Sequence, residues 1–158
     1  MTATFTQKNT LEEQLESAIK GAIETKLPGL ELYSTRTEAA LPKSFIGLVA
    51  TRGTPTGQRR QTAQGTWVFD SWGCSMIVAV RTDRSVDGAL HEQAKAACIE
   101  GLQSLEQYAD ASVMPFFEIH QVDVETIEVE ADDADEADAD ITRINATCFV
   151  FLRLGVQI

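Results

Sequence analysis

Two short runs of consecutive apolar residues limit the folds open to this chain more than any other feature. Residues 76–80 and 148–152 are apolar at every position. A strand with one wet face alternates apolar and polar residues, so an unbroken run is typical of a strand covered on both faces. We expect residues 76–80 to lie in such a strand and residues 148–152 to form the buried centre of a last strand over residues 141–158.

Two segments carry helical rather than strand spacing. Residues 11–26 and residues 88–108 repeat apolar side chains every three or four positions, which places them on one helix face. The small residues of the second stripe predict a helix that sits close against a sheet. The two stripes are Leu11, Leu15, Ala18, Ile19, Ala22 and Ile23, and Leu90, Ala94, Ala97, Cys98, Gly101, Leu102 and Leu105.

Three strands are predicted before the last one, at residues 45–52, 67–82, which includes the apolar run 76–80, and 116–130. The second is long enough to break near Gly73, where a bulge is expected. In the third, the apolar residues do not keep to alternate positions. Phe117 and Ile119 are at odd-numbered positions, Val122 and Val124 at even-numbered ones, and Ile127 at an odd-numbered one again, so the phase of the alternation changes twice. One or more bulges would bring these side chains onto one face.

The order helix, strands, helix, strands predicts an α+β fold with a mainly antiparallel sheet and two helices packed on it. At 158 residues we expect a single domain over residues 1–158, with an N-terminal arm at 1–10 and extended loops at 53–65 and 130–140. Residues 1–10 are polar and no apolar run is long enough to span a bilayer, so we expect a cytoplasmic product without a secretory signal or membrane contact.

The charge is strongly acidic, with 24 Asp and Glu against 13 Lys and Arg. This balance disfavours a nucleic-acid reader, which needs basic charge to neutralise phosphates. Seven of the acids lie within residues 130–140, the acidic turn. An EF-hand reading fails, because Ala137, Asp138 and Ile144 occupy the positions that need an oxygen ligand, a glycine and a bidentate Glu. The remaining readings are a solvated turn, a surface that repels DNA or docks on a basic partner, and weak, adventitious binding of divalent cations. The candidate residues are Asp132, Asp133, Asp135, Glu136, Asp138 and Asp140.

The loop at 53–65 has the opposite character. Arg52, Arg59 and Arg60 lie in or beside it, but no glycine pattern of a phosphate-binding loop accompanies them. Two readings stay open, a solvated connection and a loop that orders on a neighbouring protein. The aromatic residues that follow, Trp67, Phe69 and Trp72, are candidates for the core or for anchors in a subunit interface.

No arrangement typical of catalysis is present. His91 is expected on the polar side of its helix, and His120 in a strand near Glu118 and Asp123, without a nucleophile or second metal ligand at defined spacing. We therefore predict no catalytic residue, no metal site and no cofactor. The three cysteines form no CxxC pair and are expected to be small buried hydrophobic residues; they are Cys74, Cys98 and Cys148.

The succession of elements resembles the tail terminator proteins of long-tailed bacteriophages. The resemblance rests on the helix at 11–23, the pairing of 45–52 with 67–82, the helix at 90–105 and the ending Asp140-Ile-Thr-Arg-Ile-Asn-Ala-Thr-Cys-Phe-Val-Phe-Leu-Arg-Leu154. It covers nearly the whole chain as a pattern of elements and includes no signature motif, and the acidic turn is not a hallmark of that family.

The resemblance implies a non-enzymatic virion protein, assembled in the host cytoplasm, that forms a homohexameric ring. Such a ring would cap the tail tube, stop its polymerisation and join the tail to the head, with the tube protein and a neck protein as partners and DNA passing non-specifically through the channel. A head-completion or neck adaptor, or another minor tail component, is the first alternative. A small cytoplasmic enzyme or ligand-binding domain is the second.

Overall fold

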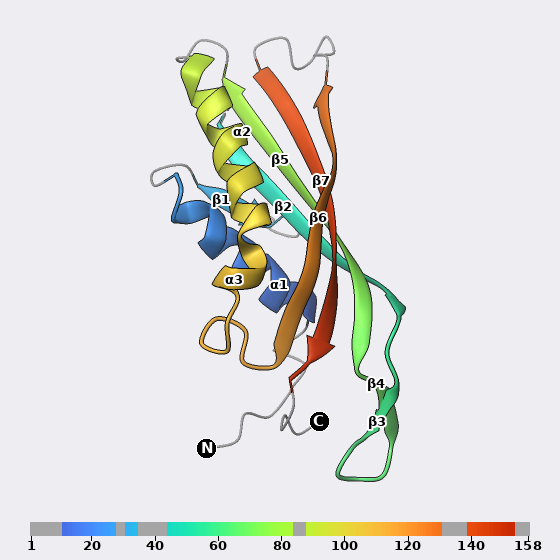
Figure 1. The fold of residues 1–158 in the computed structure, drawn as a ribbon. Helices are drawn as coiled ribbons and strands as arrows, with labels where there is room; N and C mark the ends of the chain where they lie inside the picture. Colours follow the sequence, from blue (N-terminus) through green and yellow to red (C-terminus); the bar gives the residue numbers. More distant parts are fainter. Residues whose placement is uncertain (1–10, 28–30, 35–43, 84–87, 131–138, 154–158) are drawn as a thin grey trace.

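The protein folds as an α+β domain built on one large sheet, as the order of elements predicted. A computed structural model describes residues 11–27, 31–34, 44–83, 88–130 and 139–153. These ranges contain three helices, a five-stranded sheet in the order β1-β2-β5-β7-β6 and a separate two-stranded sheet of β3 and β4. Strand β1 runs parallel to β2, and the other neighbours in the large sheet are antiparallel (Figure 1).

The strands follow the expected segments closely, with corrections at their ends. The large sheet consists of β1 (Leu32–Ser34), β2 (Phe45–Pro55), β5 (Ser71–Asp83), β6 (Phe117–Glu130) and β7 (Ala139–Leu152). The last strand was expected to reach residue 158, but β7 ends at Leu152, and residues 154–158 lie outside the described residues. The acidic turn is also shorter than 130–140, because β6 extends to Glu130 and β7 already includes Asp140.

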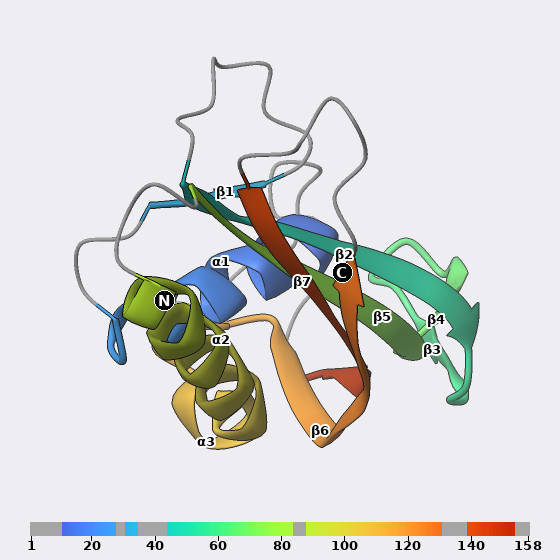
Figure 2. The ribbon, with the colours of Figure 1, turned by 90° about the horizontal axis from the view of Figure 1, so that it is seen from above.

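All three helices, α1 (Leu11–Glu24), α2 (Gly88–Gln103) and α3 (Leu105–Tyr108), lie on the same face of the sheet (Figure 2). The second predicted helix is therefore two helices, interrupted at Ser104. The Ser104 hydroxyl donates a 2.9 Å hydrogen bond to the Glu100 carbonyl oxygen, a contact that competes with regular helix geometry. Within the described ranges, no helix has the length and apolar character needed to cross a bilayer.

The core forms between this helical layer and the sheet face beneath it. Every residue of the first predicted stripe is buried, and so is the second stripe except Leu90, which is half-buried. In β5 the even-numbered side chains Met76, Val78 and Val80 point into the core and are fully buried. In β7 the even-numbered Ile144, which lies opposite Val78, is fully buried as well.

The opposite side of the sheet, which we call the outer face, has no helix on it. Ile77, whose side chain points outward from β5, is 37% exposed, and Ala79 is half-buried. The expectation that residues 76–80 are covered on both sides is therefore wrong for the single chain. The helices cover one face of this strand, and the apolar residues on its other face meet solvent.

Strand β6 reaches the core through two register shifts, as its phase change predicted. The pairing with β7 shifts once between His120 and Asp123 and again between Val124 and Thr126. Gln121, at the first shift, has a φ of 55°, a left-handed conformation that suits a bulge. Each extra residue reverses the alternation of side chains between the two faces. Phe117 and Ile119, before the first shift, and Val122 and Val124, after it, therefore all pack on the core.

The segment at 53–65 is structured, so its prediction as a loop is wrong. Strand β2 continues to Pro55, and β3 (Arg59–Gln61) pairs antiparallel with β4 (Trp67–Phe69). The intervening turn closes with a hydrogen bond from Thr62 N to Thr66 O and with Gly65 at a φ of 86°. The break between β4 and β5 falls at Asp70. The irregular pairing that we expected at Gly73 occurs in the partner strand β2, opposite Gly73, between Arg52 and Pro55.

The small stripe of α2 packs against the sheet as expected, and its Gly101 also lets α2 approach α1 closely. A Cβ atom at Gly101 would lie 2.8 Å from the Ile23 Cγ1 atom and 3.1 Å from the Ile23 Cα atom. Backbone atoms cannot move aside as a flexible side chain can, so the two helices touch at a distance that only glycine permits.

Gly101→Ala is therefore expected to lower the free energy of unfolding by about 1–3 kcal/mol, because overpacking outweighs the better helix propensity of alanine. Urea denaturation followed by circular dichroism measures the change. Gln103→Ala, at an exposed position of the same helix, is the control and should change stability by less than about 0.5 kcal/mol. A stabilised Gly101→Ala protein would show that the helices do not touch in this way.

All three cysteines are buried, as predicted. Cys74 and Cys148 lie directly opposite each other on β5 and β7, and the contact between their thiols together with burial raises the pKa of Cys148. Burial alone raises the pKa of Cys98 to about 12.

This shift predicts a loss of stability at high pH. The unfolded chain ionises the Cys98 thiol above about pH 8.5 while the folded chain keeps it neutral. Unfolding therefore releases a proton, and the free energy of unfolding falls by up to about 1.4 kcal/mol per pH unit until the folded pKa is reached. Chemical denaturation between pH 8 and pH 10 should give a shallower pH slope for Cys98→Ala than for the unchanged protein. Equal slopes would contradict the buried, neutral thiol.

Candidate interaction surface

The small sheet forms an arm that projects beyond one end of the large sheet (Figure 1). We call residues 59–69 the hairpin arm. Arg59 pairs with Phe69 and Gln61 with Trp67, so these four side chains share one side of the arm. Trp67 is 58% exposed and Phe69 46%, and the Arg59 guanidinium lies 6.0 Å from the centre of the Phe69 ring. The arm thus presents two aromatic side chains and a cation to solvent.

Arg52 and Trp72 lie at the base of the arm. The Arg52 guanidinium carbon is 5.6 Å from the centre of the Trp72 ring, and its Nε atom is 3.5 Å from the Glu12 carboxylate. Trp72 also packs edge-on against Phe117 at 6.2 Å between ring centres, so it belongs in part to the core. Arg52 and Trp72 line a hollow of about 630 Å³ together with Trp67 and Phe69.

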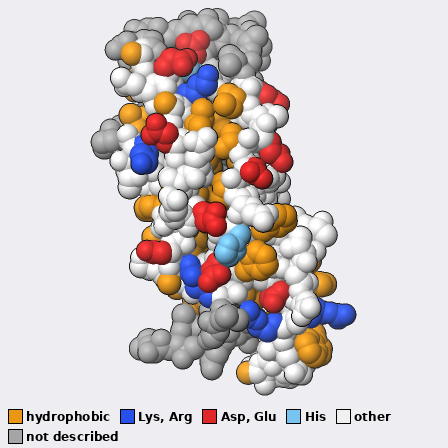
Figure 3. Space-filling view, viewed as in Figure 1, with side chains coloured by type: hydrophobic (Ala, Val, Ile, Leu, Met, Phe, Trp, Pro, Cys, Tyr) orange, Lys and Arg blue, Asp and Glu red, His pale blue; other side chains and the backbone are white. Residues whose placement is uncertain are grey.

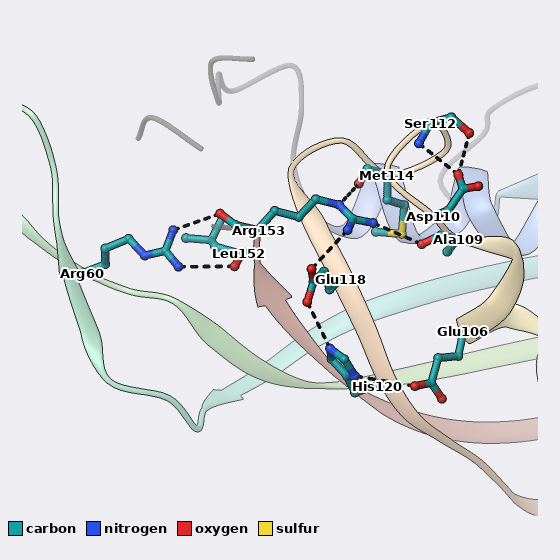
Figure 4. A network of polar contacts seen from close by, with 10 residues as sticks. All are labelled: Arg60, Glu106, Ala109, Asp110, Ser112, Met114, Glu118, His120, Leu152 and Arg153. Atoms are coloured by element: carbon teal, nitrogen blue, oxygen red, sulfur yellow. Dashed lines mark hydrogen bonds and ion pairs between the residues drawn. The ribbon is translucent and has the colours of Figure 1, made fainter. Parts of the chain in front are cut away.

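Arg60 points to the opposite side of the arm. Its guanidinium donates hydrogen bonds to the main-chain oxygen atoms of Arg153, at 3.1 Å, and Leu152, at 3.4 Å (Figure 4). These contacts tie the arm to the end of β7. Of the six residues proposed from the sequence as an interface, Arg60 alone is drawn away from the arm's aromatic side, and the other five gather on that side or at its base.

A network of charges continues from this point along the edge strand β6 to α3 (Figure 4). The Arg153 side chain is 18% exposed and donates to Met114 O at 2.7 Å, to Ala109 O at 3.3 Å and to the Glu118 carboxylate at 3.3 Å. The other Glu118 oxygen is 3.3 Å from the His120 Nε2 atom, and the Glu106 carboxylate is 3.6 Å from its Nδ1 atom. The partners of His120 are thus Glu118, as expected, and Glu106 rather than Asp123.

A hollow of about 880 Å³ opens beside this network, between the outer face and the base of the arm. We call it the outer hollow. Phe149 and Phe151, each 38% exposed, contribute aromatic surface, and the His120 ring packs edge-on against Phe151 at 5.2 Å between centres. In Figure 3 the histidine on this side of the molecule lies among acidic side chains and next to a patch of hydrophobic ones. The lining residues are Thr56, Arg60, Asp70, Glu106, Glu118, His120, Gln121, Phe149, Phe151 and Leu152.

Two sequence expectations fail at this surface. Residues 148–152 were expected to be buried throughout, but Phe149 and Phe151 face outward, because β7 alternates like any strand with one covered face. His91 was expected on the polar side of its helix, but it is buried, and its ring nitrogen atoms lie 2.8 Å from the hydroxyl oxygen atoms of Thr82 and Thr142. It ties the start of α2 to two strands of the sheet.

The acidic turn falls almost wholly outside the described residues. Asp140 is half-buried in β7 opposite Thr82, whereas Asp132, Asp133, Asp135, Glu136 and Asp138 are not described. The ends of β6 and β7 that flank residues 131–138 lie at the opposite end of the sheet from the hairpin arm (Figure 1). Glu130 and Asp140, at these strand ends, are thus separated from the arm by the length of the strands.

The outer hollow is lined by His120, three carboxylates and one guanidinium, together with aromatic side chains. Among its lining residues the only side-chain hydroxyl is that of Thr56, and there is no thiol. Within the ranges that the structure describes, no three His, Cys, Asp or Glu side chains are grouped so as to hold a metal ion. The surface combines exposed aromatic rings and guanidinium groups, which are enriched at protein contacts, with carboxylates, which are not.

Comparison with known proteins does not assign a family. Neither the family models nor the curated proteins contain a match to this sequence. One solved structure, whose name states no function, aligns over 92% of this chain and 98% of its own, with 12% sequence identity and a TM-score of 0.45.

Arg153 is the central residue of the charge network, and its removal would leave two main-chain carbonyl groups and a carboxylate without this donor. Arg153→Ala is expected to lower the free energy of unfolding by about 2–3 kcal/mol, measured by urea denaturation. Arg59→Ala, which removes a guanidinium from the exposed arm, is the control and should cost less than about 1 kcal/mol. Equal effects of the two substitutions would contradict the central position of Arg153.

Proposed function

We propose that this protein is a non-enzymatic structural component that assembles with copies of itself into a ring, as a tail terminator of a long-tailed bacteriophage. The observation that carries the proposal is the outer face of the sheet, which none of the helices in the described residues covers. Phe149 and Phe151 are exposed next to each other on the outer side of β7, and Ile77 is exposed farther along β5. We take the aromatic pair as the contact surface, because exposed hydrophobic patches on a folded protein mark sites of interaction.

The open surface is a face of the sheet rather than an edge. Strand β6 forms one edge of the large sheet, and it carries two register shifts and the exposed acids Asp123, Glu125 and Glu128. Bulges and charges on an edge strand oppose pairing with a strand of another chain. Association through side chains on the outer face and the hairpin arm is therefore favoured over extension of the sheet.

The arrangement also suits a ring with distinct ends. The hairpin arm lies at one end of the strands, and the strand ends that flank the acidic turn lie at the other (Figure 1). In the proposed ring the arm and its base, including Arg52 and Arg59, contact a neighbouring subunit or the tube protein. The acidic turn faces the channel or a neck protein, where like-charge repulsion keeps passing DNA from adhering.

A small ligand-binding domain is the second candidate function, and the outer hollow favours it. The hollow has the volume of sites that hold small molecules, and His120 and three carboxylates lie on its wall. A bound metabolite that survives purification, identified by native mass spectrometry, would support this reading. Retained function after replacement of His120 would weaken it.

The ring is tested by measuring mass in solution. Native mass spectrometry or sedimentation of the pure protein, alone and with its tail tube protein, should show a closed oligomer whose mass is a multiple of the 17.3 kDa chain. Single chains under every condition, tube protein included, would refute the proposal.

The terminator role is tested separately in the phage. Loss of a terminator should give tails with abnormally long tubes, because nothing stops polymerisation. Tails of normal length that fail to join heads would instead identify a head-completion or neck adaptor.

A further inference from the structure

We propose that the hairpin arm of one subunit docks into the outer hollow of the next subunit, with Trp67 and Phe69 on the hollow's aromatic side chains and Arg59 beside its carboxylates. This inference rests on the proposed self-assembly and names the two surfaces that make it. The arm projects and the hollow is concave, and both present exposed aromatic side chains. The arm carries the Arg59 guanidinium, and the hollow carries carboxylates.

The arm supplies what an interface anchor needs. Trp67 and Phe69 are more than 40% exposed although they are large aromatic residues, and such residues dominate the binding energy of protein interfaces when a partner buries them. Arg59 lies over the Phe69 ring, so the cation and the aromatic surface would enter a partner together. An arm that projects from the body can reach a neighbouring molecule without a clash of the two large sheets (Figure 1).

The hollow supplies the complementary features. Phe149 and Phe151 give it apolar surface, and its volume of about 880 Å³ lies in the range of pockets that enclose a small molecule, so it has room for aromatic side chains. Glu106, Glu118 and Asp70 are three carboxylates on its wall, where Arg60 is the lining guanidinium and Arg153 pairs with Glu118 from beside it. The excess of negative charge favours a basic partner such as Arg59.

The occupant is a second copy, because the arm cannot fill the hollow of its own chain with these residues. Side chains alternate along β3 and β4, so Arg60 points toward the hollow while Arg59 and Phe69 point away from it. The hydrogen bonds from Arg60 to the end of β7 hold the arm in this orientation (Figure 4).

The pairing of two different surfaces has a consequence for assembly. A contact between unlike patches repeats from one subunit to the next and closes into a ring when the rotation allows it, whereas a contact between like patches stops at a dimer. Stacking of two outer faces against each other would join like patches and would stop at a dimer. The arm-to-hollow contact is therefore the one consistent with a ring.

Two sets of substitutions test the pairing. The arm variant carries Trp67→Ser and Phe69→Ser, and the hollow variant carries Phe149→Lys and Phe151→Lys. Each variant alone should lose the ring and run as single chains in native mass spectrometry. A mixture should form dimers with one chain of each kind, because the intact arm of the hollow variant fits the intact hollow of the arm variant and no second contact can form.

The controls separate this pairing from a general effect. Ile127→Ser removes a side chain that is 45% exposed but lies in neither surface, and it should leave the ring intact. Circular dichroism checks that each variant is folded. If the hollow variant does not fold, Arg59→Glu and Glu106→Lys replace the two sets; each should weaken the ring, and the two changes combined in one chain should restore it.

Several outcomes would overturn the inference while leaving the proposed ring in place. These are an arm variant that still forms rings, two ring-deficient variants that give no mixed dimer, loss of the ring on Ile127→Ser, or a charge exchange that does not restore it. A protein that forms no oligomer even with its tube protein would overturn both the inference and the proposed function.

Discussion

The sheet has two faces, and the chain places all its helices on one of them. Within the described residues this single constraint decides which side chains form the core and which are left to solvent. The even-numbered residues of β5 and β7 pack under α1 and α2, while Ile77, Phe149 and Phe151 lie on the opposite face. The stability of the fold comes from the covered face, and the candidate contacts come from the open one.

Much of the fold could be predicted because its elements have regular spacing. The stripe from Leu11 to Ile23 is buried as expected, and the changes of phase along residues 117–127 correspond to two real shifts of register. His91 could also have been placed correctly, since it lies three residues before Ala94 and so continues the buried stripe of α2. Its polarity hid this position, and the hydroxyl groups of Thr82 and Thr142 that satisfy it come from other elements.

The candidate surface was only partly predictable, because its contacts join distant parts of the chain. Residues 59–61 have no apolar alternation, and they form a strand because residues 67–69 pair with them across a tight turn. The aromatic residues of the arm could be recognised by type, but not their exposure. The outer hollow was missed, since Glu106 in α3, His120 in β6 and Phe151 in β7 meet there only after folding, and no local pattern marks them.

The hydrogen bonds from Arg60 to the end of β7 have a mechanical consequence. The arm connects β2 to β5 and is also held by Arg60 to the end of β7, so three neighbouring strands of the sheet share a load applied at the arm. A pull on the arm against the far end of β7 would act in shear on the backbone ladder between β5 and β7, which spans the 13 residues of β5. Many bonds would have to break together rather than one after another, and the joint would resist tension along the long axis of the molecule.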